Sequence, residues 1–71
     1  MTARGVRMVE NGYVRKAPSA ASAALGVMKK GETLPFGDRT APGGWLSVVY
    51  RGVPGWVAGR LGEVFDPGLS P

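Results

Sequence analysis

The sequence contains no cysteine and no histidine, and these absences exclude much of the chemistry open to small proteins. Without cysteine, a chain of 71 residues has no disulfide framework and no thiolate metal site to stabilise it. Histidine is the most frequent general base and metal ligand, so its absence argues against hydrolytic and zinc chemistry. No apolar run approaches the roughly 18 residues that a membrane-spanning helix needs. We therefore expect no metal, no cofactor and no membrane span.

The amino-terminal residues also lack the apolar stretch of a secretory signal and carry charges where it would lie. As written, the chain is expected to be cytoplasmic. If it is a piece of a longer exported protein, its expected location is the cell envelope.

Acidic residues are few, with five Asp and Glu against nine Lys and Arg, a net charge of +4 and an isoelectric point near 10.1. This excess favours anionic partners, whether acidic wall polymers, nucleic acid or acidic proteins, and charge alone does not choose among them. The carboxylates show no catalytic spacing, no serine has an imidazole partner, and no glycine pattern forms a phosphate-binding loop. The chain is therefore predicted not to be an enzyme.

Glycine and proline are plentiful, with 12 and six copies, but they lie between apolar runs rather than in one tract. This distribution is typical of turns between short strands, and the aromatic residues and valines supply a core. The candidate strands are residues 6–9, 13–15, 25–29, 33–36, 45–50, 53–57 and 63–65. We predict an all-β barrel of five to seven short antiparallel strands, in one domain over residues 1–66 with a flexible tail over 67–71.

The connections have distinct turn signals. Asn11-Gly12 is the strongest two-residue hairpin signal, because both residues accept positive φ in a type I′ turn, and it predicts pairing of the first two strands. Arg51-Gly52 predicts a second tight turn. Residues 38–44 are rich in turn formers and are expected to form an exposed loop. The alanine-rich stretch 19–24 is interpreted as a loop, and segment 63–65 is expected to close the sheet against the first strand.

Three segments stand in an order and spacing that resemble a known family. They are Val14-Arg15-Lys16-Ala17-Pro18-Ser19, then Leu25-Gly26-Val27-Met28-Lys29-Lys30-Gly31-Glu32, then Gly43-Gly44-Trp45-Leu46-Ser47-Val48 with Gly55-Trp56-Val57. In turn they resemble the N-V-R-x-x-P-S, I-G-x-L-x-K-G and G-G-W-x-x-V…G-W-V segments of the bacterial SH3-like (SH3b) family. Tyr13 stands where that family usually has Asn, and Arg60-Leu61 where it often has an aromatic residue.

The resemblance implies an SH3-like, partly open barrel. It also implies a binding module, because family members commonly sit in cell-wall hydrolases or beside other domains and bind peptidoglycan peptides or proteins.

Trp45 is the leading candidate for a ligand-binding residue. In a strand, residues 46, 48 and 50 share one face, so they are expected to line the core while Trp45 points away from it. An outward indole is a platform for a proline ring, a sugar or a peptide. The alternatives are that Trp45 covers the end of the barrel or contacts another subunit. Tyr13 and Trp56 are secondary candidates for the groove wall, with packing against neighbouring strands as the alternative.

Charged residues supply two further candidates. Asp38 and Arg39, in the loop expected over residues 38–44, are candidates for selecting a charged partner, and solvated loop charges are the alternative. A basic patch is predicted from Arg7, Arg15, Lys16, Lys29 and Lys30. It requires the first strands to lie next to the turn at Lys30-Gly31 (the lysine turn), and a dispersed basic surface is the alternative.

Three functions follow as hypotheses. The leading one is a non-catalytic binding module that recognises a peptide or a peptidoglycan fragment through an aromatic groove. The second is a small structural or assembly protein, of phage or mobile-element origin, that works as a homo-oligomer. The third is nucleic-acid binding by the basic face, which predicts an affinity that falls steeply with salt.

Overall fold

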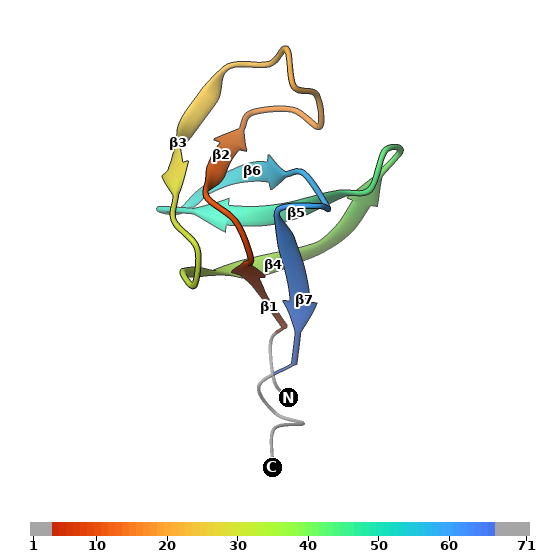
Figure 1. Cartoon of the computed structure of the whole chain (residues 1–71). Helices are drawn as coiled ribbons and strands as arrows, with labels where there is room; N and C mark the ends of the chain where they lie inside the picture. Colours follow the sequence, from red (N-terminus) through yellow and green to blue (C-terminus); the bar gives the residue numbers. More distant parts are fainter. Residues whose placement is uncertain (1–3, 67–71) are drawn as a thin grey trace.

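The computed structural model describes residues 4–66, which form one strongly curved antiparallel sheet (Figure 1). Its strands are β1 (Gly5–Met8), β2 (Gly12–Arg15), β3 (Ala24–Met28), β4 (Thr33–Ala41), β5 (Trp45–Tyr50), β6 (Val53–Val57) and β7 (Gly62–Phe65). They lie in the order β3-β2-β6-β5-β4-β1-β7. The outer strands β3 and β7 do not pair with each other, so the barrel stays open. No helix occurs among residues 4–66. The predicted all-β, partly open barrel is confirmed, while the predicted tail over 67–71 lies outside the described residues.

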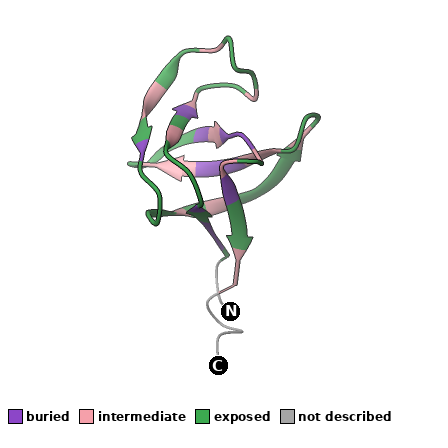
Figure 2. Cartoon of the chain, viewed as in Figure 1, coloured by how far each residue is buried: buried purple, intermediate pink, exposed green. Residues whose placement is uncertain are grey.

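The hydrophobic core lies inside the curve and is built from alternate residues of the strands. Its buried members are Val6, Met8, Val14, Met28, Val48 and Val57. Figure 2 shows buried positions on β1, β2, β5, β6 and the end of β3, whereas most of β4 is exposed. Since strand side chains alternate between faces, the residue next to each core residue lies on the outer face.

The hairpin of β5 and β6 has the bounds predicted from the sequence. Tyr50 pairs with Val53, and the two residues between them form the turn. Arg51 and Gly52 have φ values of 51° and 80°, the positive pair that a type I′ turn requires. The predicted closure of the last strand against the first is also confirmed, since β7 pairs with β1.

The hairpin predicted at Asn11-Gly12 is wrong. Neither residue has a positive φ, and Gly12 is already the first residue of β2. The Asn11 Oδ1 atom instead accepts a hydrogen bond from the Lys30 backbone N–H at 2.8 Å. Strand pairing overrides turn propensity here, because β4 and β7 bond both edges of β1 and leave none for β2.

The exposed loop predicted over residues 38–44 is wrong in its extent. β4 continues to Ala41, and residues 42–44 alone form the turn. Asp38 has a φ of 61°, and the register against β5 shifts around it. An aspartate tolerates this left-handed conformation better than most residues, so the strand passes through a bulge instead of ending.

Candidate ligand-binding pocket

The outer face of β2, β6 and β5 carries the candidate site. Val48 of β5 is buried in the core, so Trp45 and Ser47 face the other side of the sheet. The register places Ser47 beside Trp56 of β6, and Trp56 beside Arg15 of β2. Trp45, Trp56 and Arg15 therefore share one outer surface, as the strand periodicity predicted for Trp45. Ser47 faces the same way but is buried.

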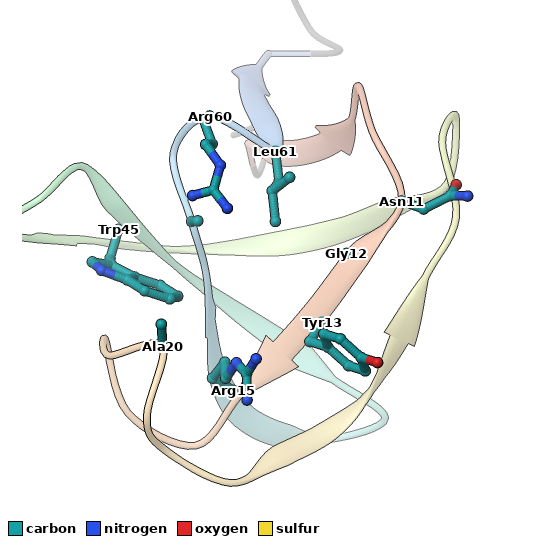
Figure 3. A pocket seen from close by; sticks show the side chains of 9 residues that line it. Asn11, Gly12, Tyr13, Arg15, Ala20, Trp45, Arg60 and Leu61 are labelled. Carbon is teal, nitrogen blue, oxygen red and sulfur yellow. The ribbon is translucent and has the colours of Figure 1, made fainter.

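A pocket of about 220 Å³ opens on this face (Figure 3). The principal side chains around it are Asn11, Tyr13, Arg15, Trp45, Arg60 and Leu61. Trp45 and Tyr13 lie on opposite sides, with Arg60 and Leu61 along one edge between them and Arg15 along the other. Two aromatic walls with a guanidinium at each edge suit a ligand that is partly apolar and partly polar.

Three glycines place Trp45 next to the loop that carries Arg60. Gly43 and Gly44, in the turn before Trp45, have φ values of 93° and 83°. A Cβ atom on Gly59 would overlap the backbone carbonyl of Gly44, so the two chain segments touch at the backbone. This close approach sets the width of the pocket on the Trp45 side.

Arg15 and Tyr13 hold each other in place on the opposite side. The Arg15 guanidinium lies over the Tyr13 ring, with its central carbon 5.0 Å from the ring centre. Its Nη1 atom donates a hydrogen bond to the Ser22 carbonyl at 2.9 Å. Tyr13 remains 52% exposed, so its outer surface is open to a ligand.

The loop between β2 and β3 closes the lower edge of the pocket with Ala20. The Ser22 hydroxyl organises this loop. Its single O–H is shared between the carbonyls of Ser19 at 2.8 Å and Ala17 at 2.9 Å, and its oxygen accepts from the Ala17 N–H at 3.3 Å. The Ser22 hydroxyl therefore links residues 17, 19 and 22 of the loop.

Replacing Ser22 with alanine is expected to lower the free energy of unfolding by about 1 kcal/mol, since the hydroxyl's hydrogen bonds are lost at a partly exposed site. Urea denaturation measures the change. Ser19→Ala is the matched control, because the Ser19 hydroxyl accepts one bond, from the Ala21 N–H. Equal stability of the two variants would contradict the assigned role of Ser22.

Sequence reasoning missed Asn11, Arg60 and Leu61. Asn11 had been interpreted as a turn residue, and Arg60-Leu61 as a departure from the family pattern. The Leu61 carbonyl accepts the Val9 N–H at 2.8 Å, and a Cβ on Gly12 would overlap the Leu61 side chain. These contacts join segments about fifty residues apart, and no local sequence signal reports them.

The other predicted ligand residues do not line the pocket. Trp56 is half-buried on the same outer face but does not line the pocket. The Asp38 carboxylate pairs with the Arg4 guanidinium at 2.8 Å, and the Arg39 N–H donates to the Ser47 hydroxyl at 2.9 Å. Their selection of a partner stays a prediction.

The predicted basic patch comprised Arg7, Arg15, Lys16, Lys29 and Lys30. Arg15 lines the pocket. Arg7 lies on β1, with its guanidinium 4.0 Å from the Glu63 carboxylate. Lys16 follows the end of β2, whereas Lys30 lies beside its start. The length of β2 therefore separates Lys16 from the lysine turn.

Across residues 4–66, no cluster of acidic residues has the grouping needed to hold a metal ion. Within the same range, the structure contains no helix with the length and hydropathy of a membrane span.

A small open β-barrel with an aromatic pocket on its outer face is typical of a binding module, which holds its ligand at the surface. The chain matches the model of the bacterial SH3 domain over residues 10–63. The chain therefore belongs to the bacterial SH3 domain family, and the resemblance noted from its three segments is confirmed. No curated protein and no solved structure gives a significant match.

Proposed function

We propose that this domain is a non-catalytic binding module, and that the pocket between Trp45 and Tyr13 holds a peptide or a peptidoglycan fragment. The main support is that two aromatic residues from distant strands face the same small cavity. Aromatic side chains give a large contact area and pack well against proline rings, sugar faces and peptide backbones.

The size of the pocket restricts the ligand further. At about 220 Å³ it is smaller than the roughly 300–1,000 Å³ of typical small-molecule sites. The pocket therefore suits one or two units of a longer chain, with the rest of the ligand extending across the surface. A linear peptide, or the peptide part of a wall fragment, has this form.

Trp45→Ala is expected to weaken binding at least about tenfold, because aromatic residues in pockets dominate the binding free energy. The ligands to titrate are a muramidase digest of peptidoglycan and a library of bacterial peptides, followed by calorimetry or amide shifts in NMR spectra. Val53→Ala is the control, since Val53 is exposed at the turn end of the β5–β6 hairpin and does not line the pocket. If the wild-type and Trp45→Ala proteins both fold and neither binds any of these ligands, the proposal fails.

The same preparations test the other two hypotheses. Sedimentation of a strict monomer at high concentration would contradict an oligomeric assembly protein. Binding of an oligonucleotide that falls steeply between about 50 and 200 mM salt would instead favour nucleic acid as the ligand.

A further inference from the structure

The charge around the pocket is of one sign. Arg15 and Arg60 line it, whereas no Asp or Glu does. The two guanidiniums lie at opposite edges of the cavity and flank the space between the aromatic walls (Figure 3). Two positive charges facing this space, with no carboxylate among the lining residues, favour a group that carries negative charge.

Both arginines keep donors available for a ligand. A guanidinium has five N–H donors in a rigid fork, and Arg15 uses one of its nitrogens on the Ser22 carbonyl. Arg60 is exposed and makes no side-chain hydrogen bond, ion pair or ring contact within residues 4–66. An arginine with no internal partner at the edge of an aromatic pocket is free to bind an anion.

We propose that Arg60 and Arg15 recognise a carboxylate of the bound peptide, while Trp45 and Tyr13 hold the adjoining apolar part. This inference rests on the proposed function and adds its ligand class, a peptide with a carboxylate at the bound segment. A carboxylate matches the planar guanidinium fork and forms charge-assisted hydrogen bonds with it. Its source is either the peptide's C-terminus or an acidic side chain.

The distribution of the other cations favours this ligand over nucleic acid. A phosphate backbone presents a charge at every nucleotide and is bound by a row of cations along its path. Lys16 and Lys30 lie near opposite ends of β2, and neither lines the pocket. The positive charge here is confined to two points around one cavity, which suits a single anionic group.

The test compares three pools of randomised hexapeptides. The first has free C-termini and no Asp or Glu, the second is C-terminally amidated and also free of Asp and Glu, and the third is amidated with one fixed Glu as its single acidic residue. The wild-type domain is expected to bind the first or third pool about 2- to 5-fold more tightly than the second, the range of a partly exposed charge pair. Whichever pool is preferred identifies the source of the carboxylate.

Arg60→Gln is expected to remove that preference, and Arg60→Lys to retain part of it through its charge. Arg51→Gln is the matched control, because it removes the same charge from the β5–β6 turn outside the pocket. Equal binding of all three pools by the wild-type domain would overturn the inference, as would identical behaviour of Arg60→Gln and Arg51→Gln. The inference would also be overturned if an oligonucleotide bound more tightly than every peptide pool and that binding depended on Arg60.

The two proposals fail in different ways. If Trp45→Ala abolishes peptide binding while charge has no effect, the pocket is the ligand site and the carboxylate inference is wrong. If Trp45→Ala changes nothing, the proposed function fails first.

Discussion

Replacing Gly59 with alanine is expected to destabilise the domain by about 2–3 kcal/mol, near the upper end of the usual cost of overpacking. The added Cβ would meet the Gly44 carbonyl, which is backbone and has no rotamer through which to move away. Relief requires the turn before Trp45 to shift, and this separates Trp45 from the loop that carries Arg60. Thermal and urea unfolding measure the loss, and a domain of this size loses about 4–8 °C in Tm per kcal/mol.

The same substitution is expected to weaken binding of the peptidoglycan digest or peptide at temperatures where the variant is still folded. Gly52→Ala separates backbone strain from pocket geometry, because Gly52 has a φ of 80° and nothing within 4 Å of its added Cβ. That control is expected to cost about 1 kcal/mol through the left-handed backbone and to leave binding unchanged. A Gly59→Ala variant as stable as the wild type would show that the two segments separate without cost.

Met8→Ala is the second large effect, with an expected loss of about 2–5 kcal/mol. Met8 is 1% exposed and packs in the core, so its removal leaves a cavity that an open barrel cannot fill by collapse. Its backbone is held as well, since its N–H donates to the Glu32 carbonyl at 2.8 Å and its carbonyl accepts from Gly31 at 2.7 Å. These bonds keep β1 from moving into the space.

A loss of this size is a large share of the roughly 4–11 kcal/mol expected for a chain of 71 residues. Urea denaturation at equilibrium measures it. Met8→Leu keeps most of the volume and is expected to cost under about 1.5 kcal/mol. Val53→Ala, at an exposed position, is expected to stay within about 0.5 kcal/mol. If Met8→Ala unfolds at the same urea concentration as Val53→Ala, the core assignment is wrong.

The elements that sequence reasoning predicted well are those controlled by near neighbours. The β5–β6 hairpin combines two strands rich in valine and aromatic residues with a turn whose second residue is glycine. Alternation along β5 also predicted that Trp45 faces away from the core. In each case the determining contacts lie within a few residues, where propensity and periodicity act directly.

The wrong predictions concern segments in which a local turn preference competes with pairing between strands distant in the sequence. Asn11-Gly12 has the composition of a tight turn, yet β1 is bonded on both sides by β4 and β7 and cannot also pair with β2. Residues 38–44 have the composition of a loop, yet β4 stays paired with β5 as far as Ala41. The strand passes Asp38 by forming a bulge there. The free energy of a local turn preference is small compared with that of pairing whole strands.

The sequence by itself determined the all-β class, the central hairpin and the outward direction of Trp45, because each follows from composition, period and turn chemistry along one stretch of chain. It also determined the family, through the resemblance of three segments to the bacterial SH3 pattern. Only the tertiary structure decided that Asn11, Arg60 and Leu61 join Tyr13 and Trp45 around one cavity. The physical reason is that the pocket wall comes from the start of β2, the start of β5 and the loop after β6, and their adjacency depends on how the whole sheet curves.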